Sequence, residues 1–146
     1  MRKPTIISEI RAFNRFYTNI IGVVDRHILD SPYSLTEVRI LFEIYHDPNS
    51  TAREIKSFLH VDEGYLSRTV DKLIKQGLIA RRKSENDGRS FILSLSKKGE
   101  KEFLKLSERS EAVVESMIMH LSSDEKNKLV FMMRRLQELL TKKEAI

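Results

Sequence analysis

One stretch of the sequence, residues 60–96, constrains the fold most because it combines a capped helix, a glycine stop and an alternating hairpin pattern. Asp62 stands where a helix N-cap is expected, since its carboxylate can accept hydrogen bonds from the free amides of the first turn. Gly77 fits the left-handed residue that ends such a helix. Two apolar runs with alternating character follow, 78–83 and 90–95. The stretch predicts a helix leading directly into two antiparallel strands.

A second, shorter helix is predicted immediately before this one. Thr51 and Glu54 have the spacing of a capping box, in which each side chain satisfies a free amide at the helix start. We expect its inward positions to be Ile55, Phe58 and Leu59. A connection of about three residues through His60 and Val61 joins the two helices. Two short helices joined so tightly are typical of a helix-turn-helix.

The second helix of this pair has an outer face suited to DNA. Its apolar positions Leu66, Val70, Leu73 and Ile74 are expected inside. The residues left on or near the outer face, and predicted to contact the major groove, are Gly64, Tyr65, Ser67, Arg68, Thr69 and Lys72. Arginine can donate to guanine O6 and N7 together, and serine or threonine can bond either base edge or a phosphate. A glycine in the first turn would permit a close approach of the backbone to DNA.

The hairpin is predicted to add a second DNA contact. Asn86-Asp87-Gly88 supplies the residues of a tight turn. We expect Phe91, Leu93 and Leu95 on the face toward the helices and Arg81 and Lys83 on the opposite face. The predicted DNA-binding residues of this wing are Arg81, Arg82, Lys83, Asp87 and Arg89. Cations at such a tip can reach minor-groove edges or flanking phosphates.

The distribution of charge supports this interpretation. The window from Arg68 to Lys83 contains six basic residues and one acidic residue, Asp71, a net charge of +5 that equals the net charge of the whole chain. Basic residues concentrated on one helix and the following hairpin are typical of a nucleic-acid surface. We therefore expect double-stranded DNA as a partner.

Helices are also predicted on both sides of this region. Residues 6–28 have an apolar stripe, and Ile7, Phe16 and Ile21 lie off it, so a second subunit is expected to cover the additional face. Ser34 or Thr36 can cap the next helix. Ser96 can cap a helix running to about Leu121, and Ser122 or Ser123 can begin a last helix with the stripe Leu129, Met132, Met133, Leu136, Leu139 and Leu140.

The predicted fold is mainly α with a small antiparallel β-hairpin, in a single domain of 146 residues. Residues 34–96 form a winged helix-turn-helix lobe, and residues 1–30 and 100–146 form dimerisation helices.

The order of these elements and several short motifs resemble the multiple antibiotic resistance regulator (MarR) family. The motifs are Leu66-Ser67-Arg68, Asp71-Lys72-Leu73, Gly77-Leu78-Ile79 and the wing Asp87-Gly88-Arg89 followed by Leu95-Ser96 and Gly99. The resemblance covers nearly the whole chain. It implies a homodimeric transcriptional regulator that binds near-palindromic operators and often responds to small anionic or phenolic compounds. By position, Ser67 and Arg68 would contact the major groove, Arg89 would enter the minor groove, and Asp87 would orient Arg89.

A pocket for a small aromatic or phenolic ligand is the least constrained expectation. By the resemblance it would lie between the dimer helices and the winged helix-turn-helix lobe. Aromatic residues that could form its walls are Phe13, Phe16, Tyr17, Tyr33, Phe42 and Tyr45. Ordinary core packing is an alternative role for the same side chains.

Other classes of protein find little support in the sequence. The chain has no cysteine, and His27, His46, His60 and His120 are scattered, so no metal or cofactor is predicted. No catalytic motif occurs, so an enzyme is not expected. The longest uncharged run near the N-terminus is too short to cross a membrane, and we expect a cytoplasmic protein.

Two alternatives stay open. One is a helical dimerisation or partner-binding module whose winged helix no longer binds DNA. The other is the DNA-binding part of an acetyltransferase fusion, because the sequence from Asp62 to Arg68 resembles that of family members that carry such a domain. A steep dependence of affinity on salt would distinguish a DNA-binding protein from the partner module.

Overall fold

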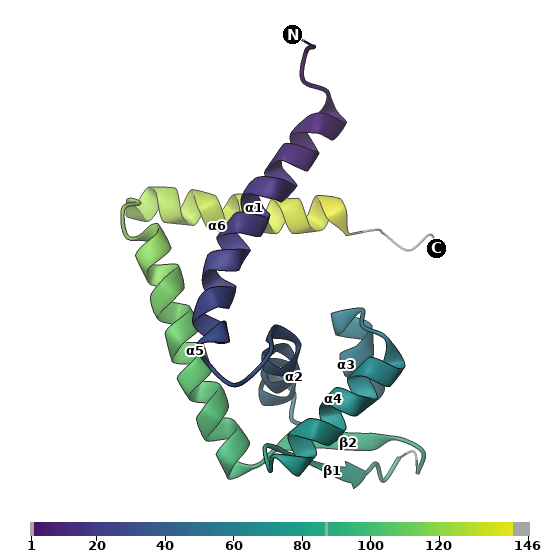
Figure 1. Cartoon of the computed structure of the whole chain (residues 1–146). Coiled ribbons are helices and arrows are strands. Elements are labelled where there is room, and N and C mark those ends of the chain that lie inside the picture. The colour runs from purple at the N-terminus through teal and green to yellow at the C-terminus, as the bar shows by residue number, and fades with distance from the viewer. Residues whose placement is uncertain (1, 87, 142–146) are drawn as a thin grey trace. The chain divides into compact units, whose positions relative to one another are not determined.

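The computed structural model of the chain describes residues 2–86 and 88–141, apart from the side chains of residues 23–29. The chain divides into two compact units, residues 1–110 and 111–146. The described elements are α1 (Ile6–Leu29), α2 (Leu35–His46), α3 (Ala52–Leu59), α4 (Glu63–Lys75), β1 (Ile79–Lys83), β2 (Phe91–Leu95), α5 (Lys97–Ile118) and α6 (Ser123–Leu140) (Figure 1). The predicted class, mainly α with one small antiparallel hairpin, is confirmed.

Polar caps fix where the helices of the winged helix-turn-helix lobe begin. The hydroxyl groups of Ser34 and Thr51 accept hydrogen bonds from the third amide of α2 and α3, and both caps are completed as capping boxes. The Asp62 carboxylate accepts a hydrogen bond of 3.1 Å from the amide of Tyr65 at the start of α4. Gly77, with φ of +76°, follows the end of α4 in the left-handed conformation. These features confirm the predicted boundaries of α2, α3 and α4.

The core of the winged helix-turn-helix lobe is formed by side chains from α2, α3, α4, the hairpin and α5. Its buried residues are Ile40, Leu41, Ile44, Ile55, Leu59, Leu66, Val70, Leu73, Leu78, Ile79, Leu93 and Phe103. The predicted inward position of Phe58 is wrong, because 65% of this residue is exposed. In the short helix α3, Ile55 and Leu59 form the line that faces the core, and Phe58 lies about 100° around the helix from Leu59.

The register of the hairpin differs from the faces predicted for its residues. Arg81 pairs with Leu93 and Lys83 pairs with Phe91. Directly paired residues of antiparallel strands lie on the same face of a sheet. The prediction that Arg81 and Lys83 lie opposite the apolar residues is therefore wrong. The other edge of β2 contacts the connection between α2 and α3, where the amide of Leu93 donates to the carbonyl of Ser50 at 2.9 Å.

Helix α5 is fixed closely to the end of α4. The Ser96 hydroxyl donates to the carbonyl of Gly77 at 2.5 Å and accepts a hydrogen bond of 3.0 Å from the amide of Gly99. A Cβ at Gly99 would overlap the carbonyl oxygen of Leu78, so only glycine permits this approach. Ser96 therefore begins α5 as predicted, although the helix ends at Ile118 and not near Leu121.

The terminal helices have most of their apolar side chains exposed. Ser122 caps α6, yet none of the residues of α6 is buried. The large exposed apolar residues of α6 are Val130, Phe131, Met132, Met133, Leu136, Leu139 and Leu140, and those of α1 are Ile6, Ile7, Ile10, Phe13, Phe16, Tyr17 and Ile21. Of the predicted α1 stripe, the side chains of Val24 and Ile28 lie outside the described residues. Across residues 2–86 and 88–141, the structure contains no helix with the length and apolar character needed to span a membrane.

Candidate nucleic-acid interface

The N-terminal half of α4 presents a polar face to solvent. Gly64, Tyr65, Ser67 and Arg68 are exposed as predicted. A Cβ on Gly64 would lie 3.2 Å from Nη1 of Arg68 and 3.2 Å from a carboxylate oxygen of Asp62. The missing side chain therefore leaves room for the Arg68 guanidinium over the first turn of the helix. This gives Gly64 a local role that the sequence did not indicate.

Thr69 does not belong to this face. The residue is 7% exposed, and its hydroxyl donates a hydrogen bond of 2.8 Å to the carbonyl of Tyr65. The predicted outward position of Thr69 is wrong because it lies beside Leu66 and Leu73 on the buried side of the helix, where a threonine hydroxyl can bond the preceding turn.

Lys72 is exposed but is bonded within the protein. Its ammonium nitrogen lies 2.7 Å from Oε1 of Glu37, a residue of α2 that is buried. The sequence did not indicate this ion pair, because the partners are 35 positions apart. Lys72 therefore differs from the other predicted major-groove residues in having a buried anionic partner.

The cations of the hairpin lie in different environments. Nη1 of Arg81 lies 3.6 Å from Oδ1 of Asp71, and the guanidinium carbon lies 5.1 Å from the centroid of the Phe91 ring. Arg81 thus lies at the junction of α4 and the hairpin. Arg82, Lys83 and Arg89 are exposed, as a DNA contact would require. Asp87, which was predicted to orient Arg89, lies outside the described residues.

A groove of about 490 Å³ lies between α3, α4 and the hairpin. Ser67, Arg81 and Arg89 are among its lining residues, so three residues predicted from separate motifs line one surface. Arg53 and Lys56 of α3 line it as well, and neither was predicted. Their positions on the polar side of α3 could have indicated them, since Ile55 and Leu59 define the opposite side.

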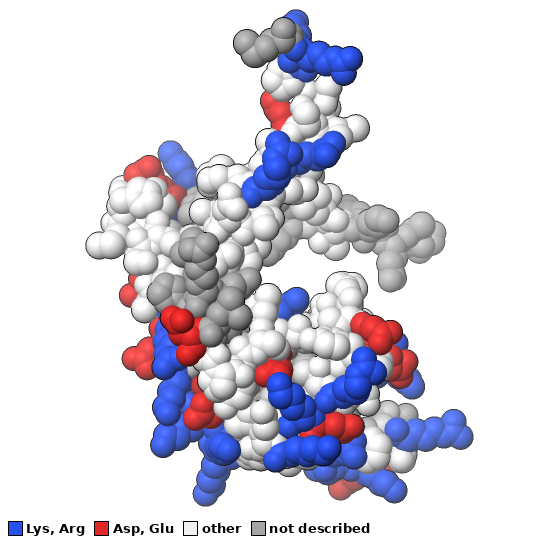
Figure 2. All heavy atoms as spheres, in the orientation of Figure 1, with Lys and Arg blue, Asp and Glu red and all other residues white. Residues whose placement is uncertain are grey.

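The charge of this surface suits a polyanion. Lysine and arginine side chains gather at the lower end of the space-filling view, where Figure 1 shows α4, the hairpin and the start of α5 (Figure 2). Acidic residues are interspersed, and two of them pair with groove cations: Glu63 with Lys56 at 3.1 Å and Asp71 with Arg81. These pairs are exposed to water, where ion pairs are weak and can exchange partners.

The six aromatic residues predicted to line a ligand pocket form two groups in the structure. Phe13 contacts both Phe16 and Tyr17 along α1, and the rings of Phe13 and Tyr17 are stacked with their centroids 5.7 Å apart. The rings of Phe42 and Tyr45 of α2 lie beside that of Phe103, with centroid distances of 6.2 and 4.6 Å.

Tyr33, the sixth of these residues, is tied into a polar contact. Its hydroxyl donates to Glu102 at 3.4 Å. Burial, followed by the charge of Glu102 and this hydrogen bond, raises the pKa of Tyr33 above its ordinary value.

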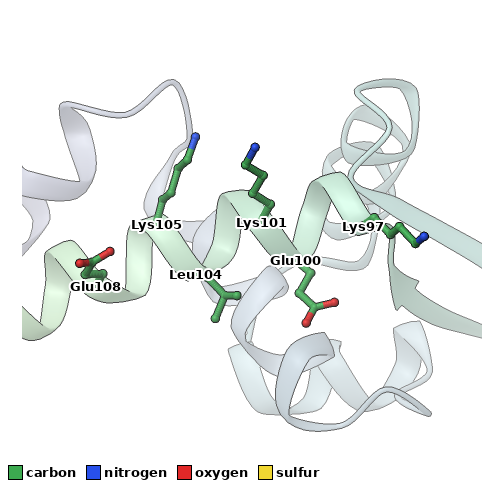
Figure 3. A pocket seen from close by; sticks show the side chains of 6 residues that line it. All are labelled: Lys97, Glu100, Lys101, Leu104, Lys105 and Glu108. Carbon is green, nitrogen blue, oxygen red and sulfur yellow. The ribbon is translucent and has the colours of Figure 1, made fainter.

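A second pocket lies on the surface of α5. It has about 420 Å³ and is lined by Lys97, Glu100, Lys101, Leu104, Lys105 and Glu108. In Figure 3, Lys101 and Lys105 point to one side of the helix while Glu100 and Leu104 point to the other. All six residues belong to α5, so the hollow is a surface feature of a single helix. In the part of the chain that the structure describes, no three His, Cys, Asp or Glu side chains lie together as a metal site would require.

Comparison with known proteins connects this geometry to a family. The sequence model of the MarR family matches residues 33–91. The chain is 35% identical over 99 residues to the HTH-type transcriptional regulator BilQ of Clostridium symbiosum, an alignment that covers 66% of this chain and 69% of the relative.

Solved structures show the same fold at lower identity. A mutant MarR from E. coli in complex with operator DNA has a TM-score of 0.73 at 20% identity, covering 94% of this chain and 100% of that chain. The PcaV transcriptional regulator from Streptomyces coelicolor in complex with its natural ligand has a TM-score of 0.74 at 17% identity, covering 94% of this chain and 98% of that chain.

Proposed function

Since the chain belongs to the MarR family of transcriptional regulators, we propose that it binds double-stranded DNA sequence-specifically as a homodimer on a near-palindromic operator. We further propose that a small aromatic or phenolic ligand relieves this binding and that the protein acts in the cytoplasm.

The observation that carries the proposal is the groove between α3, α4 and the hairpin. It brings Ser67 of α4 together with Arg81 and Arg89 of the hairpin, and Arg68 is exposed on the same helix. An α-helix fits the major groove of B-DNA, and arginine is the commonest residue to recognise guanine there. Cations on a neighbouring hairpin can neutralise phosphates or enter the minor groove. In this role Ser67 and Arg68 contact bases in the major groove, Arg89 enters the minor groove, and Arg82 and Lys83 contact the flanking backbone.

The exposed apolar faces of α1 and α6 support the homodimer. Proteins in water rarely leave so many large apolar side chains of one helix uncovered, and a two-fold dimer lets such a face be covered by a second copy. The dimerisation helices proposed here are residues 1–30 and 100–146. Two copies of α4 would then meet half-sites about 34–36 Å apart, one turn of the DNA helix.

The ligand proposal is supported by the half-exposed rings of Phe42 and Tyr45, which rest on the buried ring of Phe103. PcaV, which shares the fold, was solved with its natural ligand. A series of aromatic acids should contain one that raises the melting temperature and weakens DNA binding. If none changes either quantity, the ligand proposal fails while the DNA proposal stands.

The DNA proposal is tested by selecting bound sequences from a random duplex library. We expect one enriched near-palindrome. On that sequence, Arg68→Ala should cost about 1–3 kcal/mol of binding free energy and relax the preference at one base pair of each half-site. Arg82→Ala is the matched control, because removal of a phosphate contact weakens binding to all sequences alike. It should also lower the slope of log affinity against log salt concentration by about one per chain.

Two outcomes would contradict the proposal. Equal loss for Arg68→Ala on every sequence would remove Arg68 from base recognition. An unenriched library together with an affinity that does not depend on salt would favour a partner-binding module over a DNA-binding protein.

A further inference from the structure

Glu37 is a buried carboxylate with both oxygens engaged. Its side chain is 5% exposed. One oxygen, Oε2, accepts a hydrogen bond of 3.2 Å from the amide of Ser34 and completes the cap of α2. The other, Oε1, accepts a hydrogen bond of 2.7 Å from the ammonium group of Lys72. A single acidic side chain thus joins the start of α2 to the third turn of α4.

The partner of Glu37 is, by contrast, half in water. The Lys72 side chain is 55% exposed and lies on the helix that presents Ser67 and Arg68. A solvated lysine on such a helix would ordinarily contribute to phosphate binding. Here the ammonium group already donates a short, charge-assisted hydrogen bond to a carboxylate. The ion pair with Glu37 therefore determines how far the Lys72 ammonium group is available to DNA phosphates.

The other ion pairs of the interface have a different energetic balance. In Lys56–Glu63 and Arg81–Asp71 both side chains are exposed, so each acid returns to water when its cation turns to a phosphate. Such pairs contribute little and exchange readily. If Lys72 turned to a phosphate, the Glu37 carboxylate would stay buried without a counter-charge, which is strongly unfavourable. Lys72 is therefore retained by Glu37 where Lys56 and Arg81 are free to exchange.

We propose that Glu37 is a positioning residue that withholds Lys72 from DNA phosphates and so limits affinity for non-specific DNA. Phosphate contacts supply nearly all of the non-specific affinity of a DNA-binding protein, whereas base contacts distinguish the operator. Withholding one cation per chain lowers affinity for every sequence without removing a base contact. This inference rests on the proposed function and assigns Glu37 a part in its specificity.

The test measures binding to a random-sequence duplex by fluorescence anisotropy over a series of salt concentrations. Glu37→Gln keeps the shape of the side chain and its cap, because glutamine also completes a capping box. This variant should bind non-specific DNA more tightly, and the slope of log affinity against log salt should steepen by about 0.9 per chain bound. The double variant Glu37→Gln with Lys72→Met should return to the wild-type slope.

Glu138→Gln is the matched control. It removes one negative charge from an exposed ion pair with Arg135 in α6. It alters net charge by the same amount as Glu37→Gln but frees no cation on α4. At concentrations where sedimentation shows the same oligomeric state for this variant and the wild type, we expect the two salt slopes to be equal.

Three results would overturn the inference. The first is an unchanged slope for Glu37→Gln with folding confirmed by its urea midpoint. The second is an equal steepening in Glu138→Gln. The third is a flatter slope in the single variant Lys72→Met, which would show that Lys72 already contacts phosphate. The Lys72→Met variant tests the inference even if Glu37→Gln does not fold. A wild-type protein with no salt dependence would contradict the proposed function itself, so the two failures are distinguishable.

Discussion

The winged helix-turn-helix lobe and the terminal helices differ in how much apolar surface one chain can bury. In the lobe, Ile40, Leu41 and Leu73 are completely inaccessible to water. In α6 none of the residues is buried, although its apolar residues also recur at helical spacing. Amphipathic patterning is therefore present in both regions, but among the described residues the apolar side chains of the lobe are buried while those of α6 stay exposed. The lobe therefore buries a core of its own, and the exposed apolar residues of the terminal helices are the surface that the proposed homodimer would cover.

The largest expected effect comes from the core of the lobe. Leu73→Ala should lower the free energy of unfolding by about 2–5 kcal/mol, because a completely buried leucine leaves a cavity. Urea denaturation measures this loss, which should not depend on protein concentration. Leu139→Ala is the matched control: Leu139 is 66% exposed within the chain. Its effect should depend on protein concentration, since it would act through association. A concentration-independent loss of the same size would remove the distinction between the two regions.

The next effect concerns two glycines in the two regions. Gly99→Ala should destabilise by about 1–3 kcal/mol, because the new methyl group overlaps the backbone of Leu78. Gly22→Ala in α1 is the control, since a Cβ there meets nothing within 4 Å. Alanine favours a helix more than glycine does, so this variant should be neutral or stabilising. Thermal unfolding compares them, and equal destabilisation would contradict the close approach at Gly99.

A smaller effect is expected at the start of α6. Ser122→Ala should cost about 0.5–2 kcal/mol by removing the cap. The hydrogen bond from the Ser122 backbone amide, then the one with its side chain, lower the pKa of Glu125 below its ordinary value. A lowered folded-state pKa adds stability above the unfolded value, and this stability is lost as pH falls through the folded value. The free energy of unfolding should therefore fall less steeply between neutral and acidic pH in Ser122→Ala than in the wild type. An identical pH profile would contradict this assignment.

The smallest effect is expected at Tyr33. Its raised pKa means that the folded state favours the neutral phenol. The corresponding stability is complete below the unfolded value, about 10, and is lost as pH rises through the folded value. Tyr33→Phe should remove part of the alkaline loss of stability in urea titrations. Parallel alkaline profiles for both proteins would show that Tyr33 contributes nothing to it.

Local structure in the lobe was predictable because its determinants lie within a few residues of one another. Ser34, Thr51 and Asp62 cap amides three positions ahead, and Gly77 acts on the turn it follows. The hairpin followed from alternation and turn residues. Such short-range chemistry depends little on the rest of the fold.

The errors arose where tertiary contacts decide the outcome. Thr69 has the residue type of a polar face, but its angular position places it on the buried side of α4. The face of Arg81 depends on the register of the hairpin, in which it pairs with Leu93, and the sequence alone does not fix that register. The ion pair between Glu37 and Lys72 joins helices far apart in sequence, and the groove lined by Arg53 is formed by three separate elements.

Sedimentation equilibrium of the intact protein over a dilution series tests most directly whether the lobe is complete in one chain while the terminal helices need another. We expect a species of twice the 17.1 kDa chain mass, dissociating only on strong dilution. A mass of 17.1 kDa at every concentration, with the protein folded, would contradict this division of the molecule.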